Sequence, residues 1–529
     1  MNGPLVDHLG RPLAQGRISR ASRESGTYRG SISNYRPHRI LTSEGEAGER
    51  KLTQDRAQDL YANDFAARSA VDAISTNAVG TGLVPQPHLP HKRLNISEEE
   101  AADVKDQMEW IWAEWCTQAD AAGKMHFEDM QLAGIRSMLR MGELLHLPVM
   151  EETGHDGRTF SLAIQALSPK RLRTPEDKSI DPSIRDGVHL SPSGKPLGYW
   201  IAAPRPAYAS GLDCGGLSTA LAASDFRYVP ARVAHRPGIF HIFRNDDEEQ
   251  IRGNSTLSTG VKLFRNLADA IDYELYAQII AASFPVFFAL EGGQSGLPDA
   301  VREQYGLPPA ENPADKRYYQ SVGPGEMLYG NPGEKPEILE SKRPSQNFMN
   351  FVELILRAQG AASGISYETM FRDFSKSNYS SARAALNEDW KTFFLYRNHF
   401  SRMYCQPIWN MVQEEAWLRG RLVLPKNAPD FYAAMFLWCN CYWYGPSRGY
   451  IDPVKEIQAN VLAISERLMT RHEHFAQYGA DFTESMDTIE VEEKRLAAMP
   501  KAPDSVAVRS VHLASANDVD NKGDANADV

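Results

Sequence analysis

The sequence predicts a mixed α+β protein that is mainly helical. Short runs before residue 250 alternate apolar and polar residues, which is typical of strands. After residue 255, apolar residues recur every three or four positions, as they do on one face of a long helix. The chain of 529 residues exceeds the size that a single hydrophobic core usually serves, so we expect two or three subdomains.

Composition limits the classes of protein to consider. With 42% hydrophobic and 24% charged residues, the chain is an ordinary folded protein. Its formal charge of −11 argues against a protein that grips nucleic acid over its whole surface, but allows one that lets DNA slide. Five cysteines argue against a disulfide framework and favour a reducing compartment. No run of about 18 apolar residues and no signal-peptide core occur, so we expect a soluble, cytoplasmic protein without membrane contact.

Both ends of the chain lack a periodic pattern. Residues 1–49 form a basic N-terminal arm, whose first 40 residues hold seven arginines against Asp7 and Glu24. This composition predicts a flexible, solvated arm; a contact with a neighbouring subunit or with DNA phosphates is the alternative. Residues 500–529 are rich in Ala, Asp, Asn and Val and predict a disordered tail.

Residues 50–254 are predicted to form an α+β domain that begins with helices. A helix over 53–79 should stop at the sequence VGTGLVP, whose glycines adopt backbone angles that other residues avoid. Ser97 and Glu100 form a capping box before a second helix. Its apolar stripe consists of Val104, Met108, Ile111 and Trp115, and we interpret Trp110, Trp112 and Trp115 as packing residues rather than a binding cage.

Strands are expected in the rest of this domain. The runs 143–150 and 160–167 flank a glycine-containing turn and predict a hairpin. Further strands are expected within 197–203 and 227–243, with a surface loop at 209–224 between them.

Long helices are predicted from residue 255 onwards. The first begins at Ser255, and the second, which contains Phe348 to Ala362, lies beyond a Pro- and Gly-rich segment at 285–340. The apolar faces of the two helices predict packing through Leu257, Val261, Phe264, Leu267, Ile271, Leu275, Ile279, Phe348, Val352 and Ile355.

Two further helices are expected near the C-terminus. One begins near Ser380 and must kink or break near Pro407, which offers no N–H to the carbonyl of Met403. The other is announced by Asp452 and Pro453, an N-cap and first-turn pair.

Catalytic and metal-binding motifs are weak throughout. The acidic run 245–249 suggests magnesium for a nuclease, but such runs are more often solvated turns. Cys439 and Cys441 lack two further zinc ligands at a recognisable spacing, and His472 and His474 would point to different faces of a helix. We therefore predict no enzyme, no cofactor and no metal site.

One polar stretch stands out, FRDFSKSNYSSARAALNEDWKTFF at 371–394. A loop crowded with Ser, Asn and two cations leads directly into a long helix with large aromatic side chains on one side. An active site or the lining of a pore would need a polar loop fixed so firmly to a helix.

Four segments resemble, in this order, the portal proteins of lambda-type tailed bacteriophages: HIFRNDDEEQIRGNSTL, PGEMLYGNPGEKPEIL, GISYETMFRDFSKSNYSSARAALNEDW and DPVKEIQA. VGTGL and RMGE also resemble that family. The likeness extends over about 55–495, and the segment at 364–390 is the most specific. The acidic run at 246–249 and the loop at 209–224 depart from the family pattern, which questions local surfaces and partners.

The resemblance implies a phage portal fold with an α/β wing, a two-helix stem, a clip, a long wing helix and a helical crown. It also implies a cyclic homo-oligomer, usually a dodecamer, at one capsid vertex of the virion, assembled in the host cytoplasm. Its implied partners are the terminase, the major capsid and scaffold proteins, head-tail connector proteins, and double-stranded DNA that passes through the channel without sequence recognition. Mapped by order, the parts are 50–254 wing, 255–283 first stem helix, 284–343 clip, 344–363 second stem helix, 364–380 tunnel loop, 381–449 long wing helix and wing strands, and 450–499 crown.

Within the implied tunnel loop, five residues are candidates for contact with DNA. Arg372 and Lys376 can approach phosphates, and Ser375, Ser377 and Asn378 can hydrogen-bond them without reading bases. Each neutralised phosphate adds to the affinity for DNA, so a loop with only two cations beside an acid should bind DNA weakly. The alternative is that the residues from Asn378 onward merely cap the following helix. A capsid or neck protein without DNA contact, and more remotely a nuclease, are the other functional classes.

Overall fold

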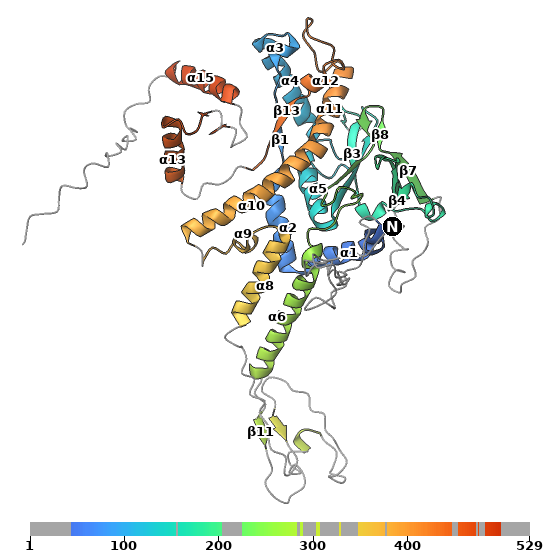
Figure 1. Cartoon of the computed structure of the whole chain (residues 1–529), viewed down its shortest axis with the longest axis vertical. Coiled ribbons are helices and arrows are strands. Elements are labelled where there is room, and N and C mark those ends of the chain that lie inside the picture. The colour runs from blue at the N-terminus through green and yellow to red at the C-terminus, as the bar shows by residue number, and fades with distance from the viewer. Residues whose placement is uncertain are drawn as a thin grey trace, which may run out of the picture. The chain divides into compact units, whose positions relative to one another are not determined.

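The fold is described from a computed structural model (Figure 1). The structure describes residues 44–154, 157–203, 225–282, 286–288, 303–306, 327–329, 348–375, 378–446, 453–471, 474–475 and 482–498. The chain divides into two compact units, Met1–Pro446 and Ser447–Val529. The predicted N-terminal arm up to residue 43, the loop at 209–224, most of the predicted clip and the tail from 500 lie outside the described residues.

The first helix predicted from sequence is divided in two. α1 spans Glu44–Asn63 and α2 spans Phe65–Ala78. Asp64 lies between them with extended backbone, and its carboxylate accepts a hydrogen bond from Ala67 N at 2.7 Å, so it caps α2. The predicted stop is confirmed, because Gly80 and Gly82 have φ of 61° and 125°. β1 (Val84–Pro87) and the short α3 (His91–Leu94) follow.

Two amphipathic helices carry the early part of the core. α4 (Glu98–Cys116) starts with the predicted capping box between Ser97 and Glu100. Its predicted stripe and Trp112 are buried, whereas Trp110 is 76% exposed and does not join the core. α5 (Phe127–Met141) ends at Gly142, which has φ of 88° and closely approaches the backbone of Gly253.

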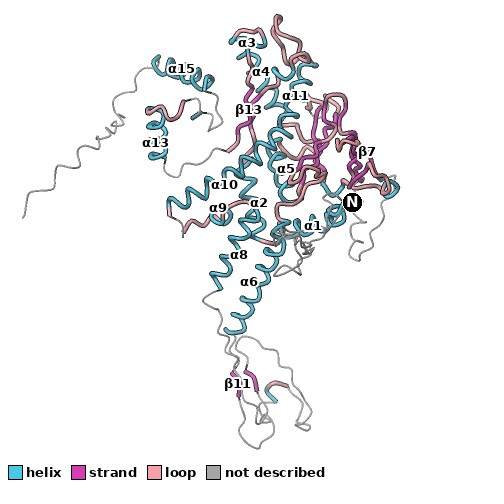
Figure 2. Tube along the Cα trace, in the orientation of Figure 1, coloured by secondary structure: helices cyan, strands magenta, loops and turns pink. Residues whose placement is uncertain are grey.

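The strands form several small sheets (Figure 2), and those made by β1–β10 and β13 are antiparallel. The predicted hairpin is confirmed: β2 (Glu143–Met150) pairs with β3 (Leu162–Leu167), and β10 (Phe240–Phe243) adds to the other edge of β2. A second sheet has the order β4-β5-β6-β7. Its strands are Ile184–Arg185, Val188–Leu190, Pro196–Ala202 and Phe226–Pro230. β8 (Arg232–Val233) and β9 (Arg236–Pro237) form a short ladder of their own. Two 3-10 turns, Pro169–Arg171 and Glu176–Lys178, lie between β3 and β4.

A buried ion cluster ties α1, β2 and β10 together. The carboxylate of Glu143 is fully buried and accepts hydrogen bonds from Arg252 Nε and His241 Nε2, both at 2.8 Å. Burial alone would raise the pKa of Glu143, but the adjacent Arg252 guanidinium outweighs it and lowers that pKa. Arg50 on α1 donates to Asp186, which also lies beside Arg252. Such a compensated cluster fixes α1 on the sheet of β2 and β10.

The two predicted long helices after residue 255 lie side by side (Figure 1). α6 covers Val261–Ala282 and is preceded by a 3-10 turn at Ser258–Gly260, so it begins six residues later than predicted. α8 covers Phe348–Ser363. Between them, the described residues contain the parallel strands β11 (Val286–Phe288) and β12 (Met327–Tyr329).

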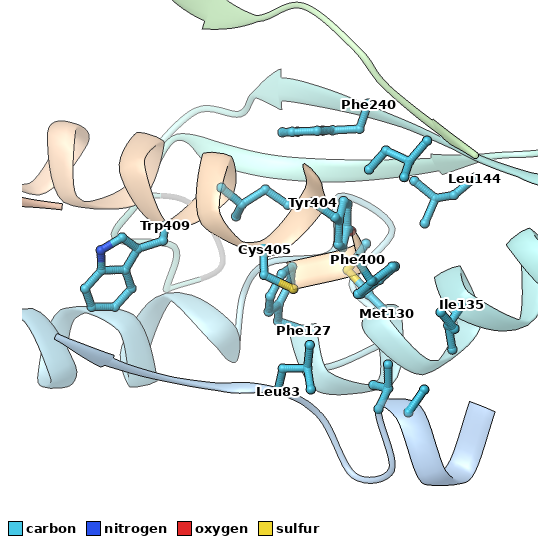
Figure 3. Packing of buried hydrophobic residues seen from close by; sticks show 14 of the residues in the cluster. Leu83, Phe127, Met130, Ile135, Leu144, Phe240, Phe400, Tyr404, Cys405 and Trp409 are labelled. Atoms are coloured by element: carbon cyan, nitrogen blue, oxygen red, sulfur yellow. The ribbon is translucent and has the colours of Figure 1, made fainter. Parts of the chain in front are cut away.

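The long helix predicted to change near Pro407 does so. α10 (Tyr379–Phe400) passes through a π-helical turn, Ser401–Cys405, into α11 (Gln406–Leu418). Pro407 occupies the first turn of α11, where its missing N–H is tolerated. The wide turn presents Tyr404 and Cys405 to the main core, where they meet Leu83, just before β1, and residues of α5, β2 and β10 (Figure 3).

The remaining elements complete each unit. α12 (Met435–Trp438) precedes β13 (Cys441–Tyr444), which pairs with β1 and so closes the first unit. The second unit contains α13 (Pro453–Ser465), where the sequence predicted a helix start, and α15 (Phe482–Ala498). Among the described helices, none has the length and apolar character needed to cross a bilayer.

Candidate functional site

The polar stretch predicted as a loop at 364–380 contains a short helix. α8 ends at Gly364, whose φ of 76° reverses the chain, and α9 spans Tyr367–Phe371. Ser366 caps α9 by accepting a hydrogen bond from Thr369 N. The segment is therefore a helical turn followed by a shorter loop, because Ser366 begins a helix and Arg372, in the left-handed region with φ of 56°, ends it.

A buried carboxylate of α10 holds the start of this segment. Asp389 is 3% exposed, and its two oxygens accept hydrogen bonds from Ser366 N at 2.8 Å and from the Ser366 hydroxyl at 2.5 Å. Thr392, one turn later, donates its hydroxyl to the carbonyl of Gly364 at 3.0 Å. Hydrogen bonds to a charged group are the stronger kind, so α10 clamps the segment where it leaves α8.

A second set of contacts joins α9 to α2. The hydroxyl of Ser69 donates to the carbonyl of Met370, whose side chain is fully buried. The rings of Phe371 and Phe65 lie 6.1 Å apart in a tilted arrangement, which aromatic pairs favour. These contacts place the base of the segment against the first unit's core.

The tip of the segment is polar and more exposed. Asp373 accepts hydrogen bonds from both the backbone N of Ser375, at 3.1 Å, and its hydroxyl, at 2.6 Å. Arg372 is exposed, and within the described residues it forms no ion pair. Lys376 and Ser377 lie outside the described residues. Of the two candidate cations, the structure therefore describes only Arg372.

Asn378 performs the capping role considered as the alternative. Its Oδ1 accepts a hydrogen bond from Ser381 N at 2.8 Å, at the first turn of α10. Two of the candidate hydrogen-bonding residues, Ser375 and Asn378, are thus engaged in local structure. The Nδ2 group of Asn378 takes no part in that cap, so capping leaves it available for an outside acceptor.

α10 is fixed to the rest of the unit by a buried arginine. Arg397 is 6% exposed and donates to the carbonyls of Ala78 and Asn77, at 2.8 and 2.9 Å, and of Pro446 at 2.7 Å. Burial lowers the pKa of Arg397 to about 10. The guanidinium also lies over the rings of Trp390 and Phe394. It satisfies the carbonyls at the end of α2 and fixes the direction of α10.

The predicted packing residues of α6 and α8 differ in burial along the helices. Leu257, Phe264 and Leu267 are fully buried in the single chain. Five of the packing residues are half-buried: Val261, Ile271, Phe348, Val352 and Ile355. Leu275 and Ile279, near the end of α6, are 55% and 49% exposed. The end of α6 far from the core thus leaves apolar side chains uncovered. Exposed apolar side chains on the two helices include Tyr273, Leu275, Tyr276, Ile279, Met349, Phe351 and Leu354.

The described residues contain no group of three or more His, Cys, Asp or Glu side chains placed to hold a metal ion. Burial raises the pKa of the thiols of Cys116, Cys439 and Cys441. His472 lies outside the described residues. The acidic run at 246–249 is exposed, and Asp246 pairs with Arg244.

Sequence reasoning missed the anchors of the segment. Asp389 contacts Ser366 across 23 positions and Ser69 contacts Met370 across 301, so neither has a local pattern. The only available signal for Asp389 is an acid on the otherwise apolar and aromatic side of its helix.

The family of the chain follows from comparison with known proteins. Residues 31–397 match the family model "Phage portal protein, lambda family". This match covers well over half of the chain, so the protein belongs to the lambda family of phage portal proteins, which are components of the virion.

Individual relatives agree with this membership. The chain is 26% identical over 446 residues to the portal protein of Escherichia phage N15, with 81% of each chain covered. It is 25% identical over 462 residues to portal protein B of Escherichia phage lambda, with 84% of each covered.

Solved structures with a similar chain come from gene transfer agent particles. One is the virion of the native particle, with 14% identity, a TM-score of 0.39, and coverage of 85% of this chain and 97% of the other. Another is the neck of the native particle, computed with C12 symmetry, with 14% identity, a TM-score of 0.38, and coverage of 83% and 99%.

Proposed function

We propose that this portal protein forms a closed ring and that double-stranded DNA passes through the ring during packaging and ejection. The observation that carries the proposal is the uncovered apolar surface of α6 and α8. Leu275 and Leu354 are 55% and 65% exposed, on helices whose other faces already pack together. Apolar patches of this kind mark an interface with another chain. A head-to-tail contact between identical subunits closes into a ring when its rotation permits.

The segment at 364–380 then serves as the part that meets DNA. Asp389 and Ser69 support its base, while Arg372 is exposed at the end of α9. The guanidinium of Arg372 and the second cation of the segment, Lys376, would meet phosphates, which carry no sequence information. Few cations per subunit keep the affinity low, since each neutralised phosphate releases counterions and strengthens binding. A low affinity suits a duplex that has to move.

Family membership supports the assignment of the parts and partners. We assign 50–254 to the wing, α6 and α8 to the stem, 284–343 to the clip and 450–499 to the crown. On this assignment the terminase, the capsid and scaffold proteins and the head-tail connector are the partners of the ring. The protein would act without a cofactor, as a channel and docking platform rather than an enzyme.

Native mass spectrometry of the purified full-length chain, over a range of salt concentrations, tests the ring. We expect one predominant closed oligomer, and averaged electron micrographs viewed down its axis should show a central opening wide enough for a DNA duplex to pass. A monomer at every salt concentration would overturn the proposal. A ring with a narrower opening would instead favour a neck protein without DNA contact.

A further inference from the structure

The outer surface of α4 contains a cavity beside an exposed tryptophan. Trp110 is 76% exposed, and it lines a cavity of about 670 Å³ together with Asp106, Gln107 and Arg421. None of the ring, channel or DNA-contact arguments uses this surface. A large exposed aromatic side chain at the wall of a cavity is typical of a binding site, since Trp is enriched where partners anchor.

The cavity is preformed by hydrogen bonds between α4 and the segment after α11. Gln107 accepts a hydrogen bond from Val423 N at 3.0 Å. Arg421 pairs with Glu114 and lies over the ring of Phe160, 4.7 Å from its centroid. The cation at the cavity is therefore already neutralised by an acid of its own wall, and the wall keeps its shape without an occupant.

The surface around Trp110 is acidic. Seven acids against Lys105 alone occur in α4, and the exposed positions Glu99, Asp103, Asp106 and Trp110 recur at spacings of three and four along one face. Within the described residues Asp106 forms no ion pair. Carboxylates around a tryptophan face favour an arginine-rich occupant, through charge-assisted hydrogen bonds and a cation–π contact. They would repel the phosphates of DNA.

The chain itself supplies a segment of that chemistry. Residues 1–43 hold seven arginines, no lysine and two acids, a net charge of +5. They precede α1, which begins at Glu44, and an extended chain of 43 residues reaches about 140 Å. The positive charge of the arm complements the acidic face of α4, and the arm is long enough to reach it.

We infer that the arginine-rich N-terminal 43 residues dock on this acidic face. One arginine of the arm lies over Trp110, and neighbouring arginines of the arm pair with Asp103 and Asp106. The arm is thereby retained on the wing. The α4 cavity is a site for the protein's own terminus rather than for DNA.

Site-specific photo-cross-linking in the full-length protein tests the docking. Benzoylphenylalanine is placed at Trp110, and as a control at Ile180, which is 93% exposed on a different surface. Irradiation followed by peptide mass spectrometry should join position 110 to peptides from residues 1–43, at least several-fold more often than position 180. Cross-links from 110 to other segments or to other proteins, or an equal yield from both positions, would overturn the inference.

Charge reversal tests the electrostatic part in the same assay. Asp103→Lys combined with Asp106→Lys should reduce the cross-link from position 110 several-fold, since it places positive charge beside an arginine-rich arm. The matched control is Asp247→Lys with Glu248→Lys, which reverses two exposed acids elsewhere. Thermal unfolding checks that both variants remain folded. An undiminished cross-link in the first variant would contradict recognition by charge.

Discussion

The carboxylate of Asp389 on α10 accepts two hydrogen bonds from Ser366, one from the backbone N of Ser366 at 2.8 Å and one from the Ser366 hydroxyl at 2.5 Å. This pair connects the end of α8 to α10, on the other side of the polar segment. The position of the start of the segment thus depends on one buried carboxylate, while Ser69 holds its other end through Met370.

Replacing Asp389 with Ala should loosen the segment without unfolding the protein. The loss of a buried, charged acceptor leaves Ser366 without its partner and costs about 1–3 kcal/mol of the free energy of unfolding. Trypsin should cleave faster after Arg372 and Lys376 in this variant. The control is Glu388→Ala, next in sequence, whose exposed carboxylate pairs with Lys391 on the surface. Equal cleavage rates in the two variants would show that Asp389 is not the anchor.

Changing Arg372 and Lys376 together to Ala should leave ring assembly intact and alter the packaging or retention of DNA. Arg372 is exposed at the end of α9 and forms no ion pair within the described residues, so its removal should not destabilise the fold. Particle assembly and DNA content are measured side by side, with Arg265→Ala plus Lys391→Ala as a double control of equal charge change. Failure to assemble would mean that the cations hold subunits together, and stable heads with full DNA content would place the segment away from the channel.

Two substitutions in α6 separate folding from assembly. Phe264 is fully buried in the single chain, so Phe264→Asp should cost several kcal/mol and give insoluble or unfolded protein. Ile271→Asp, at a half-buried position, should both weaken the fold and prevent ring formation. Leu275 is 55% exposed, so Leu275→Asp should fold normally and fail to form rings.

Asn266→Asp, at an exposed position on the opposite side of the same helix from Leu275, is the control, and unfolding temperature and oligomer mass are the two readouts. Rings of normal mass from Leu275→Asp would show that this face of α6 points to solvent.

The buried pair of His146 and Tyr404 predicts a loss of stability in acid. His146 Nδ1 lies 2.7 Å from the Tyr404 hydroxyl, and burial lowers the pKa of His146 to about 4. In the unfolded chain the pKa is near 6.5. Between these values the unfolded state binds a proton that the folded state does not, so stability falls as the pH drops from about 6.5 to 4, by about 3 kcal/mol in total.

Chemical denaturation across this pH range measures the effect. His146→Asn removes the titrating group, so its free energy of unfolding should depend less steeply on pH, whatever its absolute stability. Parallel slopes for the variant and the natural sequence would refute the assignment to His146.

Long periodic elements could be predicted from the sequence, and contacts between distant residues could not. The capping box at Ser97 and the hairpin of β2 and β3 rest on patterns within ten to thirty residues, and both were confirmed. α9 was missed because five residues are too few for a periodic signal. The division of α1 from α2 at Asp64 was missed because Asp is tolerated inside an amphipathic pattern.

Burial at the candidate site depended on tertiary packing. Trp110 and Trp112 are alike in sequence context, yet one faces outward and the other joins the core, since they lie about 200° apart around α4. The predicted apolar face of α6 was continuous, whereas its burial in a single chain ends near Ile271. A sequence pattern records that a face is apolar but not which chain covers it.

The π-helical turn at Ser401–Cys405 sets the direction in which the polar segment is presented. Buried residues recur in steps of four through the turn, at Phe400, Tyr404, Ile408, Val412 and Ala416. In a regular α-helix each step of four residues would rotate this buried stripe by about 40° around the helix axis. The wide turn absorbs part of that rotation, so that α10 and α11 face one core. Deleting one residue from the turn would rotate α10 by about 100° relative to α11. The direction in which Asn378 points around the helix axis, at the far end of α10, thus depends on the length of a five-residue turn more than twenty positions away.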